Sequence, residues 1–363
     1  MNIALLGYGV VGKGVYDIIS NDHPNLKIKY IVEKDKEKLG NLKHLAPTSF
    51  TDVLEDNEID VVIELIGGKT VAYQMIKEAL LHKKHVVTAN KAVISEFFEE
   101  LTTIAKSNDV SLLFEASVGG AIIVLDPLYR IAEINKISGI TGIINGSTNF
   151  VLSSIFLENQ SLEDALKKAS DLGYIEANST DDMDGFDLLR KINILSMISY
   201  HTYIKEEDIE RTPLSSISSD FISYVKSHNL AMKYIATSKE HSGKISIHLE
   251  PVILEKEAFY NQINFEDNII SITGAYHKNQ LFIGQGAGRY PTASAVLNDI
   301  LVIEKQEKRE HKFNCLLEVS NAETYRFLIQ TINGFKVVEN KTINEVKSIK
   351  DLVCFARLEG DIL

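Results

Sequence analysis

Short apolar runs alternate with longer segments of mixed polarity along the first 127 residues of the chain. The runs are rich in valine, isoleucine and leucine and have the length of buried strands, whereas the segments between them have helical length. Alternation of this kind predicts a parallel, doubly wound sheet in an α/β domain over residues 1–127. The expected strands are 3–6, 27–32, 61–66, 84–88 and 111–116. One helix is expected to begin at residue 13, and three others are expected over 51–57, 71–82 and 95–107.

The pattern changes after residue 127. Helices and strands are now segregated along the chain, which predicts an α+β domain over residues 128–284. The expected elements are a strand over 137–144, a polar turn over 145–149, helices over 150–157 and 162–172, a loop over 173–184, a long apolar helix ending near 200, and mostly strands over 232–282.

The last part of the chain begins with a charged stretch, residues 305–312, which has the composition of a linker. Beyond it we expect a helix over residues 323–332 among short strands. So few residues rarely build a stable core of their own, and we treat residues 306–363 as a small C-terminal appendage.

Composition excludes several classes of protein. The formal net charge of -12 argues against binding to nucleic acid, which needs lysines and arginines for the phosphates. The sequence has no apolar run long enough to span a membrane and no signal-peptide pattern, so we expect a cytoplasmic protein without a membrane partner. The two cysteines, Cys315 and Cys354, both lie near the C-terminus, which excludes a cysteine nucleophile in the main body.

The first motif with chemical content is Gly7-Tyr8-Gly9-Val10-Val11-Gly12. It follows a strand and opens a helix, which is the context that dinucleotide binding requires. The glycines allow a tight turn and a close approach of the pyrophosphate to backbone N–H groups at the helix N-terminus. The motif therefore predicts a Rossmann-type cofactor domain.

The end of the second strand bears on the choice of cofactor. Glu33 lies about 20 residues past the glycines, where an acidic side chain accepts hydrogen bonds from the ribose hydroxyls of NAD. Lys34 could instead meet the 2′-phosphate of NADP. The spacing favours NAD and leaves NADP open.

Lys91 lies in the run Thr88-Ala89-Asn90-Lys91, directly after the fourth expected strand. Ligands bind at the carboxyl ends of parallel strands, so this lysine is a candidate for a functional role.

Asp187 and Lys191 are four residues apart on one face of the long apolar helix. Apolar residues occupy the other faces of this helix as well, which predicts that it is mostly buried. A charged pair on a buried helix is costly and is often functional. The alternative is an ordinary surface ion pair, and the apolar neighbours argue against it.

An acidic loop precedes this helix, with Glu176, Asp181 and Asp182 following Tyr174. Alone, the loop could simply be solvated. Its position beside the Asp187/Lys191 helix makes it a candidate for binding an ammonium group.

Taken together, the motifs make the chain similar to homoserine dehydrogenases over about residues 1–305. Seven motifs occur in the order of that family: residues 7–12, 64–68, 88–91, 115–120, 145–149, 173–191 and 284–296. The resemblance implies NAD(P)-dependent interconversion of L-homoserine and L-aspartate 4-semialdehyde by hydride transfer. It also implies a homodimer or higher homo-oligomer, a second domain that binds the substrate and forms the dimer, and a return of residues 285–305 to the first domain.

The resemblance also implies roles for individual residues. Lys91 and Lys191 would be the catalytic lysines, and Asp187 would orient Lys191. The substrate would be bound by Glu176, Asp182, Tyr174, Gly146 and Ser147. The cofactor would contact the glycine motif with Val10 and Val11, together with Glu33, Ile66, Gly67, Lys91 and Gly286.

A monovalent cation, sodium or potassium, is implied at Glu115, Val118, Gly120 and Ile122. The chain departs from the family here, because Ala121 and Ile123 replace a glycine and a proline. The tail is also shorter than the regulatory ACT-type domain of many members and could be a reduced form of it.

The sequence leaves two other functions open. One is a different nicotinamide-dependent dehydrogenase of the same fold that acts on another amino acid or on a sugar. The other is a cofactor-binding sensor without catalysis, which would not need Lys91, Asp187 and Lys191.

Overall fold

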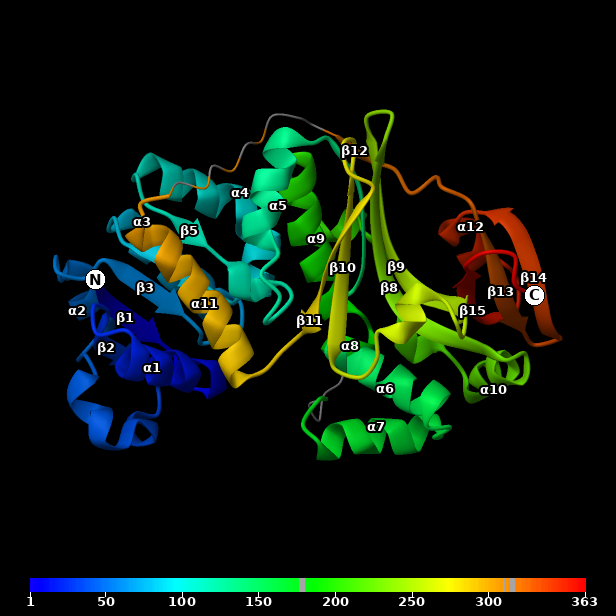
Figure 1. Ribbon diagram of the computed structural model, residues 1–363, viewed down its shortest axis with the longest axis horizontal. Helices are drawn as coiled ribbons and strands as arrows, with labels where there is room; N and C mark the ends of the chain where they lie inside the picture. The colour runs from blue at the N-terminus through cyan, green and yellow to red at the C-terminus, as the bar shows by residue number, and fades with distance from the viewer. Residues whose placement is uncertain (176–179, 308, 310, 312, 314–316) are drawn as a thin grey trace. The chain divides into compact units, whose positions relative to one another are not determined.

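The computed structural model describes residues 1–175, 180–307, 309, 311, 313 and 317–363 (Figure 1). The chain forms two compact units. The first comprises Met1–Arg130 and Ala287–Asn314, and the second comprises Ile131–Gly286 and Cys315–Leu363. None of the helices within the described ranges combines the length and hydrophobicity that crossing a membrane requires.

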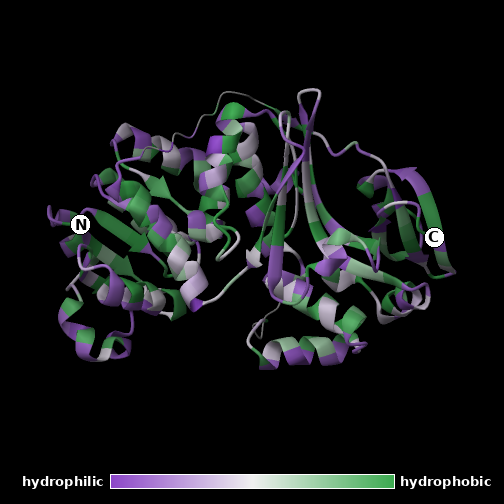
Figure 2. Cartoon of the chain, in the orientation of Figure 1, coloured by the Kyte–Doolittle hydropathy of each residue, from purple (hydrophilic) through white to green (hydrophobic). Residues whose placement is uncertain are grey.

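The first unit contains a parallel sheet of five strands in the order β2-β1-β3-β4-β5. The apolar runs of the sequence form the strands of this sheet, and the residues of β3 are all buried. Figure 2 shows the strands of this sheet as largely hydrophobic. The elements are β1 (Asn2–Leu6), α1 (Val10–Asp22), β2 (Lys27–Val32), the 3₁₀ segment η1 (Lys36–Leu45), α2 (Phe50–Glu55), β3 (Val61–Glu64), α3 (Thr70–Leu81), β4 (His85–Thr88), α4 (Lys91–Ser107), β5 (Leu112–Leu113), η2 (Glu115–Ser117), most of α5 (Leu125–Ile134) and α11 (Arg289–Glu304).

The strand order confirms the predicted Rossmann-type sheet. From β1 the chain moves outward to β2 and then crosses to β3 on the other side of β1. Such a switch point opens a crevice at the carboxyl ends of β1 and β3, where ligands of this fold bind. The last strand is shorter than expected, because the chain leaves the sheet after Leu113 and turns into η2 at Glu115.

The second unit is built on a ten-stranded sheet, with the main path β11-β10-β6-β8-β9-β15-β13-β14. Strands β7 and β12 both pair with β9. The elements are β6 (Ile137–Ile143), α6 (Gly146–Leu157), α7 (Leu162–Asp171), α8 (Thr180–Met183), α9 (Phe186–Tyr200), η3 (Glu206–Asp208), β7 (Glu210–Arg211), η4 (Leu214–Ser216), α10 (Ser219–Ser227), β8 (Leu230–His241), β9 (Lys244–Glu255), η5 (Phe259–Gln262), β10 (Asp267–Gly274), β11 (Asn279–Gln285), β12 (Glu318–Val319), β13 (Tyr325–Thr331), β14 (Gly334–Lys341), α12 (Ile343–Lys347) and β15 (Leu352–Leu358).

The predicted helix over residues 323–332 is wrong. The structure has strand β13 there, between β14 and β15 in the sheet. Phe327 and Ile329 pack with Phe355 in a buried cluster. A short apolar run suits a strand with partners on both sides as well as it suits a helix, and only those partners decide between them.

Lys233 on β8 is an unusual core residue, because its side chain is only 1% exposed. Its Nζ donates to the carbonyl of Ile263 at 2.6 Å and to the amide oxygens of Asn149 and Asn264, each at 2.9 Å. Because these partners are neutral, burial dominates and lowers the pKa of Lys233 to about 7.

This environment predicts a pH-dependent stability. Between pH 7 and pH 10.5 the unfolded chain holds the Lys233 proton more tightly than the folded chain, so stability should rise with pH. Relative to Lys233→Met, the wild type should gain up to about 1 kcal/mol per pH unit in urea unfolding between pH 7 and 9. Lys239→Met, on the same strand with an exposed side chain, serves as the control. A gap between wild type and Lys233→Met that stays constant with pH would contradict the prediction.

Candidate active site

The glycine motif forms the turn between β1 and α1, as the sequence predicts. Gly7 has a φ of +95°, and a Cβ there would lie 2.6 Å from the carbonyl oxygen of Leu65. A Cβ on Gly12 would collide with the carbonyl oxygen of Gly7. Gly9 differs, because a Cβ there would meet no atom within 4 Å. Gly9 is the N-cap of α1 and offers no side-chain cap, so the first N–H groups of the helix, at Val10 and Val11, are open to a ligand.

The free space at Gly9 indicates a glycine that faces a ligand, whereas the close contacts at Gly7 indicate a glycine that the fold itself requires. We expect Gly9→Ala to weaken cofactor binding by about tenfold or more at an unchanged Tm, because its methyl group enters only the space that a pyrophosphate would use. Gly7→Ala should instead lower stability by at least about 1–2 kcal/mol through left-handed strain and the clash with Leu65. Fluorescence titration and thermal unfolding measure the two effects, and equal loss of stability in both variants would contradict the distinction.

Glu33 lies at the end of β2 and faces the glycine turn. Its carboxylate accepts the N–H of Tyr8 at 2.9 Å and the N–H of Asp35 at 3.2 Å. Burial acts to raise the pKa of Glu33, but the backbone N–H groups outweigh it, and the pKa lies below its ordinary value. The side chain is therefore an ionised acceptor beside the turn, while Lys34 is exposed.

A buried carboxylate that the sequence analysis missed joins the ends of β3 and β4. Glu64 accepts the N–H of Ile66 at 2.8 Å and the hydroxyl of Thr88 at 2.6 Å. Burial raises the pKa of Glu64, and these donors oppose that rise. The network shapes the Ile66–Gly67 turn and the start of α4, whose first residue is Lys91. The signal was a single acidic residue that interrupts the otherwise apolar run 61–66.

In the second unit, Asp187 and Lys191 form the ion pair that their spacing predicts. The distance from Lys191 Nζ to Asp187 Oδ2 is 2.8 Å, and the two residues are only 9% and 6% exposed. Lys191 also donates to the carbonyl of Ile144 at 2.8 Å. Two fixed acceptors hold the ammonium in one orientation, which a surface pair would not achieve.

Asn145 connects this pair to Asp182, which lies on α8 where the sequence predicted a loop. Its amide nitrogen donates to Asp187 Oδ2 at 2.8 Å and to Asp182 Oδ1 at 2.7 Å. Its amide oxygen accepts the N–H of Thr148 at 2.7 Å and so caps α6. Burial raises the pKa of Asp182, and the Asn145 hydrogen bond opposes that rise. The sequence analysis assigned roles to the next two residues of this motif and missed Asn145 itself.

The remaining predicted residues of this unit lie nearby. Gly146 and Ser147 begin α6, and the Ser147 hydroxyl donates to the carbonyl of Tyr174 at 2.6 Å. Gly286 lies against Asn268, whose buried side-chain oxygen and nitrogen find no hydrogen-bond partner among the described residues. Glu176 lies outside the described residues. The structure thus joins Lys191 to Asp187, and Asn145 links Asp187 to Asp182. Ser147, two residues after Asn145, is bonded to Tyr174.

Comparison with known proteins identifies the family of the chain. The homoserine dehydrogenase family model matches residues 124–301, and the NAD-binding domain model of homoserine dehydrogenase matches residues 7–115. The chain is 35% identical to homoserine dehydrogenase of Bacillus subtilis over 316 residues, which cover 84% of this chain and 73% of the relative. It is 33% identical to the enzyme of Synechocystis over 84% of this chain and 73% of that one. A crystal structure of S. aureus homoserine dehydrogenase superimposes with a TM-score of 0.81 at 28% identity, covering 99% of both chains. The chain therefore belongs to the homoserine dehydrogenase family.

Proposed function

We propose that the protein interconverts L-homoserine and L-aspartate 4-semialdehyde, with Lys191 exchanging the proton of the substrate hydroxyl. The observation that carries the proposal is the buried Lys191–Asp187 pair, which Asn145 joins to Asp182. A dehydrogenase of this kind needs a proton acceptor, a positive group beside the developing carbonyl oxygen, and an anion for the substrate ammonium. These three requirements match the side chains of this cluster.

Each residue of the cluster has its own proposed role. Asp187 and the carbonyl of Ile144 hold Lys191 Nζ in place. As a neutral amine, Lys191 takes up the hydroxyl proton during oxidation and becomes the ammonium, which returns the proton during reduction. Asp182 binds the substrate ammonium together with Glu176. The N–H groups of Gly146 and Ser147, at the N-terminus of α6, suit the substrate carboxylate, and Tyr174 positions Ser147. Lys91, at the start of α4, is the second proposed acid–base lysine.

The first unit binds the nicotinamide cofactor, which when bound supplies the hydride chemistry. We place the pyrophosphate at Gly9 and the start of α1, with Ile66 and Gly67 on the neighbouring turn. Glu33 supports NAD as the preferred cofactor, because an ionised carboxylate beside the glycine turn accepts ribose hydroxyls and repels a 2′-phosphate. Gly286 is the last of the proposed cofactor residues.

A monovalent cation fits the loop after Glu115. Val118, Gly120 and Ile122 are buried, and among the hydrogen bonds of the described residues none ends on their carbonyl oxygens. Buried carbonyls are normally paired, and three oxygen donors in one loop suit an alkali cation. We therefore propose that these carbonyls, in the loop that starts at Glu115, hold sodium or potassium despite Ala121 and Ile123.

The activity is tested by following the absorbance of reduced nicotinamide with homoserine and either NAD or NADP. We expect homoserine-dependent reduction that is faster with NAD, and oxidation of the reduced cofactor by aspartate semialdehyde. Turnover of another amino acid or a sugar, but not of homoserine, would favour the related-dehydrogenase reading. Cofactor binding without turnover of any of them would favour the sensor reading. The domain limits, the cytoplasmic location, the homodimer and the regulatory origin of residues 306–363 stay predictions.

A further inference from the structure

The charged stretch after α11 is more than a solvated linker, because Arg309 enters the interior of the first unit. Its side chain is only 6% exposed. One terminal nitrogen donates to Asp299 Oδ1 at 3.0 Å, and the other donates to Asp126 Oδ1 at 2.9 Å. The carboxylate of Glu115 lies 3.9 Å away. Glu115 and Asp299 are fully buried, so Arg309 supplies the positive charge that these carboxylates need.

The partners of Arg309 control both ends of the loop 115–126. At the first end, Asp299 Oδ2 accepts the backbone N–H of Glu115 at 2.8 Å. At the second end, the Glu115 carboxylate accepts the N–H groups of Val124, Leu125 and Asp126 at 2.7, 2.7 and 2.8 Å. Arg309 thus contacts Asp299, which holds the start of the loop, and Asp126, which is its last residue.

We propose that Arg309 is a positioning residue that clamps the loop 115–126 and sets the geometry of its carbonyl oxygens for a monovalent cation. The inference rests on the cation site of the proposed function. A guanidinium suits this task because its planar fork reaches two carboxylates at once, whereas a lysine ammonium is a single point charge.

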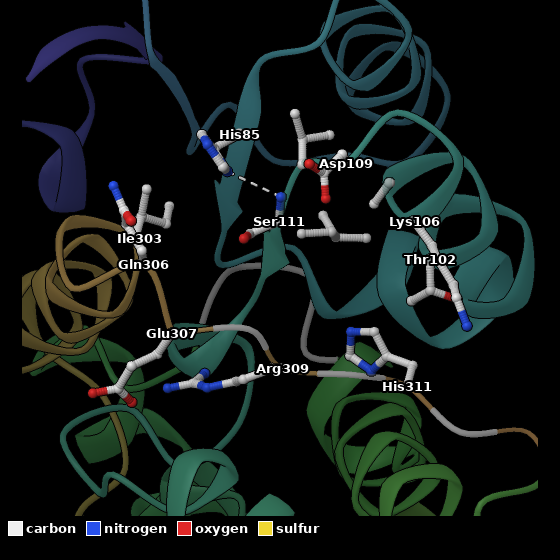
Figure 3. A pocket seen from close by; sticks show the side chains of 13 residues that line it. His85, Thr102, Lys106, Asp109, Ser111, Ile303, Gln306, Glu307, Arg309 and His311 are labelled. Carbon is white, nitrogen blue, oxygen red and sulfur yellow. Dashed lines mark hydrogen bonds between the residues drawn. The ribbon is translucent and has the colours of Figure 1, made fainter.

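The space around Arg309 can accommodate another side chain. Together with His85, Lys106, Glu307 and His311, it lines a pocket of about 530 Å³ beside β5 (Figure 3). A smaller or differently shaped side chain therefore has room and does not force a clash. Arg130 offers a matched control, because it also approaches Asp126, at 3.6 Å, but has a side chain that is 64% exposed.

The test compares wild type with Arg309→Met, Arg309→Lys and Arg130→Met. Potassium and sodium are titrated against choline at constant ionic strength, and both the cation-dependent rise in Tm and the rate are recorded. We expect the half-saturating cation concentration to increase by about tenfold or more in both Arg309 variants. It should stay within about twofold in Arg130→Met, and the cofactor Kd should not change in any variant. Arg309→Lys retains the charge, so a loss there identifies the bridge between the two carboxylates as the cause.

Wild-type cation affinity in folded Arg309→Met would overturn the proposal. If the wild type itself shows no cation-specific response, the cation site of the proposed function is wrong. The role of Arg309 in holding the loop is then tested separately, by hydrogen exchange of the backbone amides of residues 115–126. Faster exchange in Arg309→Met and Arg309→Lys than in Arg130→Met would then support the clamp, and equal exchange in all variants would overturn it.

Discussion

Replacing Lys191 by methionine is expected to lower kcat/KM for homoserine by about 10³-fold. The substitution removes the proposed proton-exchanging group, and methionine cannot replace its hydrogen bond to Ile144. Stability should also fall, by up to about 3–5 kcal/mol, because Asp187 loses its buried partner. Cofactor affinity should stay within about twofold, because the glycine motif belongs to the other unit.

Lys191→Arg separates the lost stability from the lost chemistry. Arginine retains the positive charge and can pair with Asp187, but it does not release a proton in proteins. We expect this variant to be nearly as stable as the wild type and almost as inactive as Lys191→Met. Lys167→Met removes an exposed Lys–Asp pair of similar spacing on α7 and should leave turnover unchanged. A turnover of Lys191→Arg within about tenfold of the wild type would exclude Lys191 as the acid–base group.

Replacing Asn145 by leucine is expected to lower kcat/KM by about 10²-fold or more, with both a lower kcat and a higher KM. The variant removes a donor that Asp187 and Asp182 share. The two carboxylates then lose their fixed separation, which misplaces both Lys191 and the ammonium site. Stability should fall by about 1–3 kcal/mol, because the buried Asp187 and the half-buried Asp182 each lose a donor and α6 loses its cap.

Asn193→Leu provides the structural control for this prediction. Asn193 is a fully buried asparagine on α9 whose amide donates to the carbonyl of Ile204 at 3.2 Å. Its replacement should cost similar stability while homoserine kinetics below the unfolding temperature stay near those of the wild type. Steady-state rates and thermal unfolding of both variants distinguish a role of Asn145 in positioning the site from a role in stability alone. Parallel losses of activity would mean that Asn145 acts only through the stability of the unit.

Several features of the site were predictable because they depend on residues close together in the sequence. The glycine turn follows from a strand, three glycines and a helix start in direct succession. The Asp187–Lys191 pair follows from a spacing of four on a helix, which brings two side chains together whatever the rest of the chain does. The apolar residues around that pair also indicated its burial, and the structure has both side chains in the interior.

Other features required the folded chain. Asn145 meets Asp182 and Asp187 across 37 and 42 residues. Likewise, Arg309 reaches Asp126 from 183 residues further along the chain. No local pattern encodes such contacts, so the hydrophilic stretch around Arg309 resembled a solvated linker. The apolar run of β13 was compatible with a helix until its neighbouring strands were known.

The parallel cofactor sheet, the glycine turn and the buried lysine–aspartate pair were therefore predictable from the amino-acid sequence, because local spacing and hydrophobic periodicity encode each of them. The folded chain was needed to show which donors hold the carboxylates of the site. It was also needed to show that the guanidinium of Arg309 neutralises the carboxylates around the Glu115 loop. Those choices depend on burial and on long-range contacts, where a polar group leaves water only if a distant residue supplies its partner.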